Sequence, residues 1–358
     1  MNIFKIFYQG LRVSPYPLLY SLLYGYYAKH PGFKNFTNQP LLPLKDIQDD
    51  EPCYRFIFFG DIFATEAVPD VSASLAEIFS RADLIFGNLE CPVIYTTQAE
   101  LRRDKNGANF WSKSISEEFV MRLLNNTAIN PSKLILSIAN NHSQDWGDQG
   151  LIATMQFLTN HNINFVGEFI KQAPLIKTFE IKAANFNIGV LAWTNWLNHP
   201  IEKKFTKPEE FSIIQLRNIQ NIKIETKYDC LIALPHWDYE YQHFTHKKTQ
   251  QLAKLIADKG FNIIAGSHTH TIQPLAVLDH CYCLYSLGNM LNPGHKLSRS
   301  WSSNLGFAWE VFINKVTKNI TGYIIHPFIH DPIKNQLRLF DLNDDQEYKD
   351  ILSKVYKL

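Results

Sequence analysis

Short hydrophobic runs alternate with helix-periodic segments along the first half of the chain. Residues 55–59 (RFIFF), 83–86 (DLIF) and 133–138 (KLILSI) have the composition of buried strands. Between the first two runs, apolar residues recur at helical spacing, at Leu75, Ile78, Phe79 and Ala82. Strands that alternate with helices in this way predict an α/β fold.

Polar residues at the ends of these segments predict where the helices begin and end. Ser74-x-x-Glu77 and Ser114-x-x-Glu117 each have the spacing of a capping box, so we expect helices to start there. Further helices are expected around residues 151–158 and 252–256, and Gly260 would terminate the second of these.

The second half of the chain becomes richer in strands toward its end. We expect strands at 187–193, 229–234 and 262–265, with a helix near 209–222 between the first two. Three further strand-like segments follow with no helix between them, at 282–287, 306–313 and 322–325. This order predicts two packed sheets with outer helices.

The N-terminal region carries the features that bear on location. Residues 1–30 are rich in Phe and Tyr, but the apolar run at 17–27 is shorter than the ~20 residues that span a bilayer. No small-residue cleavage site follows it, so we expect neither a secretory signal nor a transmembrane helix. We expect a cytoplasmic protein whose residues 1–30 either pack on the domain or contact a membrane. Residues 31–53 contain several prolines and resemble a linker or wrapping arm.

Composition narrows the function classes. The 358 residues are 46% hydrophobic, which excludes disorder as the main state, and the net charge of +1 argues against nucleic acid as a partner. The five cysteines are scattered and odd in number, so a disulfide framework is not expected. Cys281 and Cys283 share one face of an apolar strand, where we expect buried thiols.

Five predicted strands end in short loops that contain potential metal ligands. Because carboxyl ends of strands in an α/β sheet form one rim, residues from distant parts of the chain can converge there. The residues in these loops are Asp61, Glu90, Asn141, His142, His236, His268 and His270.

Two carboxylates, an amide and several imidazoles form a mixed oxygen and nitrogen ligand set. Such a set suits Mn²⁺, Fe²⁺ or Zn²⁺ better than Ca²⁺, and a shared carboxylate would hold two ions about 3.5–4 Å apart. A nearby imidazole could protonate a leaving group. Each piece also has an ordinary interpretation, since Asp and Asn form turns and most of the 13 histidines should be structural. The coincidence of five such loops favours one or two divalent ions.

At these residues the sequence resembles the CapA family of bacterial capsule and poly-γ-glutamate biosynthesis proteins. The matching segments are FFGDIF (58–63), ADLIFGNLECPV (82–93), SIANNHSQDWGDQG (137–150), PHWDYEY (235–241), GFNIIAGSHTHTIQP (260–274) and LYSLGNM (284–290). The resemblance implies a calcineurin-like metallophosphoesterase fold, a four-layer αββα sandwich. It also implies an N-terminal arm and linker at 1–53, a metallophosphoesterase-like domain at 54–330 and a C-terminal tail at 331–358.

The resemblance also implies a role for each loop residue. Glu90 would bridge two metals. Asp61 and His270 would bind the first ion, His236 and His268 would bind the second, and Asn141 would be a further metal ligand. His142 would be the general acid or contact phosphate, and residues 286–289 would shape the rim.

Three positions depart from the usual pattern. Phe63 stands where the wider superfamily has a histidine, Asp238 where a glycine is usual, and Ser267 where a histidine usually precedes His268. The first metal site should therefore have few ligands. Asp238 could compensate as a ligand or by orienting a ligand histidine, or it could be a surface turn residue.

The resemblance favours a metal-dependent hydrolase that acts on an anionic polymer or phosphorylated precursor, together with capsule or poly-γ-glutamate synthesis proteins. In the polar insertion, Arg102, Arg103 and Lys105 could bind substrate phosphate or carboxylate, or could lie in a solvated loop. Two alternatives remain open. One is a general phosphoesterase unrelated to capsule, and the other is a non-catalytic assembly subunit with a vestigial metal site.

Overall fold

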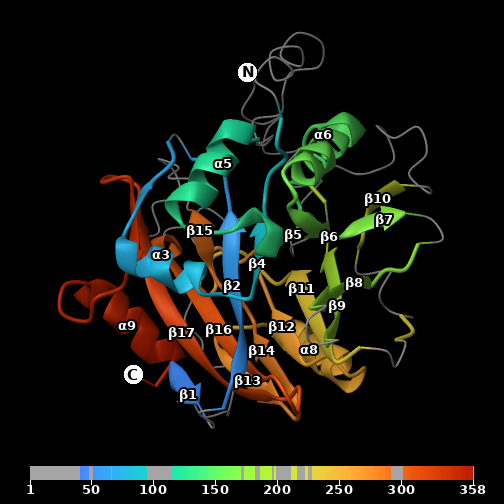
Figure 1. The fold of residues 1–358 in the computed structure, drawn as a ribbon. Coiled ribbons are helices and arrows are strands. Elements are labelled where there is room, and N and C mark those ends of the chain that lie inside the picture. The colour runs from blue at the N-terminus through green and yellow to red at the C-terminus, as the bar shows by residue number, and fades with distance from the viewer. Residues whose placement is uncertain are drawn as a thin grey trace.

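The protein folds around two mixed β-sheets (Figure 1). The structure is a computed structural model that describes residues 41–47, 51–65, 67–94, 114–170, 173–181, 186–195, 197–198, 211–215, 222–224, 228–291 and 301–357. Two mixed sheets with helices confirm the predicted α/β class.

The larger sheet has the order β3-β18-β17-β16-β2-β4-β5-β6, with β1 added on β17 and β15 on β2. Its strands are β1 (Lys45–Ile47), β2 (Cys53–Ile62), β3 (Asp70–Val71), β4 (Leu84–Leu89), β5 (Leu134–Ser137), β6 (Asn164–Val166), β15 (Asn289–Leu291), β16 (Leu305–Asn314), β17 (Ile320–Asp331) and β18 (Gln336–Leu339). The neighbours β2, β4, β5 and β6 are parallel, so their carboxyl ends lie at one edge.

The smaller sheet has the order β13-β14-β12-β11-β9-β8. Its strands are β8 (Lys177–Ile181), β9 (Phe186–Thr194), β11 (Cys230–His236), β12 (Ile263–Ala265), β13 (Leu275–Leu278) and β14 (Cys281–Leu284). The central strands β9, β11, β12 and β14 are parallel, and both edge strands are antiparallel to their neighbours. A separate ribbon pairs β7 (Glu168–Ile170) with β10 (Phe211–Ile213).

The two sheets pack face to face. Alternate residues of β11, such as Ile232 and Leu234, point into a core shared with the larger sheet. Aromatic contacts cross the interface, since the ring of Phe186 on β9 lies 5.6 Å from Tyr54 and 6.3 Å from Phe56 on β2. Burial of these large rings supplies the main driving force for joining the sheets.

Helices cover the outer faces. The helices are α3 (Ala73–Ser80), α5 (Glu117–Asn126), α6 (Gly147–Asn160), α8 (Lys247–Asp258) and α9 (Gln346–Val355), with 3₁₀ turns η1 (Pro131–Lys133) and η4 (Trp301–Asn304). Phe79 of α3 packs edge-on against Phe59 of the larger sheet, and Ile256 of α8 packs with Leu231 and Ala233 on the outer face of the smaller sheet. Figure 1 shows α3 and α8 on opposite sides of the molecule. The layers are thus helix, sheet, sheet, helix.

The structure corrects both predicted capping boxes. The N-cap of α3 is Ser72, whose hydroxyl accepts from the Leu75 backbone, and the N-cap of α5 is Ser116, whose hydroxyl accepts from Phe119. The box predicted at Ser74 therefore begins two residues after the true N-cap. The box predicted at Ser114 begins two residues before it.

The helix predicted near residues 209–222 is wrong where the structure describes that segment. Residues 211–213 form β10, which pairs with β7, and residues 214, 215 and 222 are not helical. The other expected helices and strands are present within a few residues of their predicted ranges, including α8, which ends before Gly260 at φ +96°.

The chain on either side of the central region joins the same sheet. β1 pairs with β17, and β18 pairs with both β17 and β3. α9 buries Tyr348, Ile351, Leu352 and Val355 in the main core. Residues assigned above to an arm and a tail thus contribute strands and a helix.

The structure also bears on the membrane and cysteine predictions. Among the described residues, no helix is long and apolar enough to cross a membrane. Residues 1–30 and the insertion with Arg102, Arg103 and Lys105 lie outside the described residues.

All five cysteines are free, and Cys281 and Cys283 are buried as expected.

Candidate metal centre

The carboxyl ends of strands from both sheets meet at one buried place. Asp61 lies at the end of β2, Glu90 directly follows β4, and His236 is the last residue of β11. His268 and His270 follow β12, in the turn that leads toward β13. The structure thus brings these five predicted residues together, and each is at most 7% exposed.

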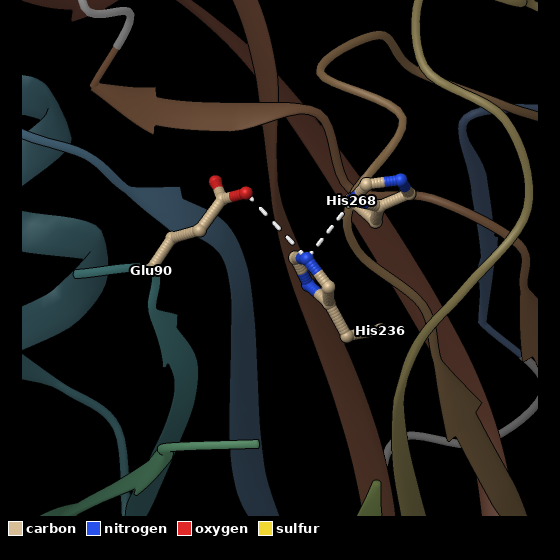
Figure 2. Close-up of side chains that lie close together, drawn as sticks. All are labelled: Glu90, His236 and His268. Carbon is tan, nitrogen blue, oxygen red and sulfur yellow. Dashed lines mark hydrogen bonds and ion pairs between the residues drawn. The ribbon is translucent and has the colours of Figure 1, made fainter. Parts of the chain in front are cut away.

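Glu90, His236 and His268 form a first group of potential ligands (Figure 2). His236 Nε2 lies 3.5 Å from Glu90 Oε1 and 3.0 Å from His268 Nδ1. Asn141 joins the group, because its Oδ1 lies 2.8 Å from the same His236 nitrogen. Two imidazole nitrogens, a carboxylate oxygen and an amide oxygen therefore converge.

Asp61, Glu90 and His270 form a second group. His270 Nδ1 lies 3.6 Å from Asp61 Oδ2 and 3.6 Å from Glu90 Oε2. Glu90 thus faces one group with each carboxylate oxygen. This is the geometry of a carboxylate shared between two ions.

Glu90 itself provides a test of whether the residues fit a metal. Neither of its buried oxygens has a hydrogen-bond partner among the described residues. Leaving a buried carboxylate without a donor is costly, and a cation between it and the histidines would satisfy it. The donor set of oxygens and imidazole nitrogens suits a divalent ion.

Burial affects the protonation of the carboxylate and of the imidazoles in opposite ways with respect to metal binding. Burial raises the pKa of Glu90 well above its usual value, and the nearby charges of Asp61, Glu240 and Asp145 add to the effect. Burial lowers the pKa values of His236 and His268 well below their usual values, helped by the neighbouring histidines. A bound cation favours carboxylate ions and neutral imidazoles, which are the forms that bind metal.

The backbone around these ligands is held in uncommon conformations. His268 has φ +94° and His270 has φ +55°, values that a residue with a side chain adopts at a cost. On β2, directly before Asp61, a Cβ on Gly60 would lie 1.8 Å from the Gly288 carbonyl oxygen. Asp61 N donates to that same oxygen at 3.1 Å, so the missing side chain lets β2 place Asp61 in the site.

His142 lies beside the metal-ligand groups in the turn after β5. Its Nδ1 lies 2.8 Å from Asp145 Oδ2, a distance that fixes the ring and directs Nε2 away from Asp145. The ring of Phe63 stands edge-on to both His142 and His270, at centroid distances of 5.1 and 6.0 Å. Phe63 therefore forms an apolar wall between the two imidazoles.

Several residues contact the candidate ligands although the sequence did not predict such contacts; of these, only Asn289 was expected near the site, as part of its rim. Asn88 donates to Asp61 Oδ1 at 2.7 Å and lies 3.3 Å from His236 Nδ1. Glu240 Oε1 lies 3.9 Å from His268 Nε2, and Asn289 Oδ1 lies 2.9 Å from His270 Nδ1. Asn88 and Glu240 stand within the matching segments, in GNLE and HWDYEY. Nothing in those segments indicated that this amide and this carboxylate contact the candidate ligands.

The contacts of Asp238 differ from those expected. Its carboxylate accepts from the backbone of Tyr239 and His246, and Oδ1 lies 2.6 Å from His246 Nδ1. His246 is the N-cap of α8, and Asp238 is only 2% exposed. Asp238 is therefore not a surface turn residue; its contacts lead to the start of α8 rather than to a candidate ligand, which argues against compensation at the metal site.

These observations define a class: an α/β protein whose two sheets bring buried carboxylates and histidines together in two potential metal sites that share Glu90. The chain belongs to the family described as bacterial capsule synthesis protein PGA_cap, whose sequence profile matches residues 47–293. This confirms the resemblance identified from the motifs.

Two curated relatives are similar over part of their length. The PGA biosynthesis protein CapA of Bacillus subtilis (strain 168) is 26% identical over 245 residues, which cover 65% of this chain and 62% of the relative. The capsule biosynthesis protein CapA of Bacillus anthracis is 24% identical over 218 residues, covering 59% of this chain and 51% of the relative. The matched region thus spans between about half and three fifths of these relatives.

A solved structure of a novel phosphatase from Mycoplasma pneumoniae is also similar. It has a TM-score of 0.36 and 14% sequence identity, and the match covers 84% of this chain and 99% of that chain.

Proposed function

We propose that this protein is a metal-dependent hydrolase of the phosphoesterase type that takes part in capsule or poly-γ-glutamate synthesis. The single observation that carries the hydrolase assignment is Glu90, a buried carboxylate that has no hydrogen-bond donor in the described part of the chain and belongs to both potential metal sites. Membership of the capsule synthesis family supports the pathway.

Each residue has a role in this proposal. Asp61, Glu90 and His270 hold one divalent ion, and Glu90, Asn141, His236 and His268 hold the other. When bound, such ions supply Lewis-acid stabilisation of charge that develops on a phosphoryl oxygen. His142 holds a proton at Nε2 for the leaving group, while Asp145 fixes the ring through Nδ1.

The proposed substrate is an anionic or phosphorylated molecule of the kind used in capsule assembly. The names of the two relatives support this choice, as both refer to capsule or PGA biosynthesis. We propose Arg102, Arg103 and Lys105 as contacts to its phosphate or carboxylate groups.

A second candidate is a non-catalytic assembly subunit, and Phe63 favours it. The group formed by Asp61, Glu90 and His270 has a single histidine among its carboxylate and imidazole ligands within the described residues, and Phe63 adds an apolar wall beside it. An ion held there weakly would leave the centre incomplete.

One experiment separates these functions. Purified protein is analysed for bound transition metals and assayed with p-nitrophenyl phosphate and its bis ester after loading with Mn²⁺. We expect metal and turnover, with His142→Ala retaining the metal and losing 10²–10⁴-fold in kcat. The exposed His280→Ala is the control. Metal without turnover on any phosphate ester would support the assembly subunit, and absence of metal would contradict the hydrolase and agree with an assembly subunit whose site is vestigial.

A further inference from the structure

The described part of the loop that follows β9 reaches the candidate metal centre without contributing a carboxylate or histidine to it. In the smaller sheet, Thr194 at the end of β9 stands in register with His236. The next residue, Asn195, donates its backbone N–H to the His236 carbonyl at 3.1 Å. The chain leaving β9 is therefore tied to the strand end that carries His236, and a few residues later it reaches Asn198.

Asn198 contacts two consecutive residues of the turn after β5. Its backbone N–H donates to the Asn141 carbonyl at 2.9 Å, and its side-chain Oδ1 accepts from Asn141 Nδ2 at 3.3 Å. Its own Nδ2 lies 3.3 Å from Nδ1 and 3.4 Å from Nε2 of His142. One half-buried amide thus connects the proposed ligand Asn141 with the proposed acid His142.

The side-chain contact with Asn141 matters because a primary amide can present either of two ends. Only the oxygen can bind a cation, whereas the NH₂ group would repel it, and the two ends have nearly the same shape. In this structure Asn141 Oδ1 faces His236 Nε2 at 2.8 Å, and Asn141 Nδ2 faces Asn198. An acceptor at Asn198 is what distinguishes the two orientations.

We propose, on the basis of the function proposed above, that Asn198 is a positioning residue that turns the oxygen of Asn141 toward the metal centre. Partners that orient metal ligands typically change metal affinity by about 10–100-fold. The backbone hydrogen bond from Asn198 holds the loop whatever its side chain is, so the orienting effect belongs to the side-chain oxygen alone.

Three variants test the proposal by titration of the metal-free protein with Mn²⁺, followed by the electron paramagnetic resonance signal of the free ion. Asn198→Ala removes the acceptor and should weaken the binding of one ion by about 10–100-fold. Asn198→Asp keeps an oxygen facing Asn141 Nδ2 and should restore the affinity. Asn195→Ala is the control, because it removes another asparagine side chain from the same loop. The Oδ1 atom of Asn195 has no hydrogen-bond partner among the described residues, so this variant should bind Mn²⁺ as the parent does.

The outcomes separate this inference from the proposed function. Equal Mn²⁺ affinity in Asn198→Ala and the parent overturns the inference alone, as does an Asn198→Asp protein that binds as weakly as Asn198→Ala. A lower melting temperature of metal-free Asn198→Ala than of metal-free Asn195→Ala would show a structural role and also overturn it. A parent protein that binds no Mn²⁺ overturns the proposed function, and the inference with it.

Discussion

At the scale of single residues, the proposed metal ligands near Glu90 lead to a prediction about stability. Because an ion that binds only the native state stabilises it, removal of a ligand should lower metal content and melting temperature together. We expect His268→Ala to lose metal and, at an ion concentration 100 times the dissociation constant, to lose about 2.7 kcal/mol of ion-dependent stabilisation. Metal analysis and thermal unfolding with and without Mn²⁺ measure the two effects.

The exposed His280 provides the matched control for this prediction, because His280→Ala removes an imidazole from the turn between β13 and β14, outside both potential ligand groups. Unchanged metal content in His268→Ala would show that this histidine is not a ligand. A melting temperature that falls equally with and without Mn²⁺ would show packing rather than metal binding.

The potential metal ligands could be found from the sequence, whereas Asn198, which we propose orients one of them, could not. These potential ligands stand at strand ends, where topology brings distant loops together; they are Asp61, Glu90, His236 and the two histidines after β12. Asn198 has no such signal, since its contacts depend on how the loop after β9 turns toward β5. Likewise, nothing in the sequence shows that Asp238 pairs with His246 rather than with a ligand.

At the scale of elements, the start of α5 gives a test of the corrected helix cap. The Ser116 hydroxyl accepts from the Phe119 backbone N–H at 3.1 Å, which satisfies one of the free donors in the first turn. Ser116→Ala should lower the free energy of unfolding by about 0.5–2 kcal/mol in urea titrations. Ser114→Ala is the control, and an equal or larger loss in that variant would restore the predicted box.

Element boundaries were misplaced for a physical reason that the two serine pairs illustrate. A capping box needs only Ser and Glu three residues apart, and Ser72 and Ser74 are both near the start of α3. Which of them is the cap depends on the backbone, and Ser72 has the extended ψ of 143° that precedes a helix. The predicted helix near 209–222 failed similarly, because β10 forms through pairing with the distant β7.

At the scale of the whole molecule, two buried histidines outside the metal groups should make stability depend on pH. Burial lowers the pKa of His330 to about 4, although Asp331 opposes the effect, and burial lowers that of His243 to about 4 as well. As pH falls below about 6.5, histidines in the unfolded chain gain protons before these two do. The unfolded state is therefore favoured progressively between pH 6.5 and 4.

For His330 alone this amounts to about 3 kcal/mol of stability lost across that range. Urea titrations of metal-free protein at a series of pH values measure it. His330→Gln should flatten the decline relative to the parent, whereas the exposed His280→Gln should not. Parallel pH profiles for the parent and His330→Gln would show that His330 is not kept neutral in the native state.

The contacts of the residues after 330 show how far along the chain the folded unit extends. The resemblance to a known family ends near residue 330, and that limit suggested a separate tail. In the structure β18 extends the larger sheet and α9 places Leu352, which is fully buried, in the main core. Tyr356 also donates from its hydroxyl to the Gln273 carbonyl at 2.9 Å, in the segment between β12 and β13. We therefore propose that residues 331–357 belong to the same cooperative unit as the candidate metal centre.

Leu352→Ala tests this proposal, because a cavity in a shared core weakens the entire unit. The free energy of unfolding should fall by about 2–5 kcal/mol, and unfolding in urea should remain a single transition at a lower midpoint. Ser353→Ala, on the exposed face of the same helix, should change the midpoint little. An early, separate transition in Leu352→Ala, with the main midpoint unchanged, would mean that α9 unfolds independently and that residues 331–357 are an appendage to the fold.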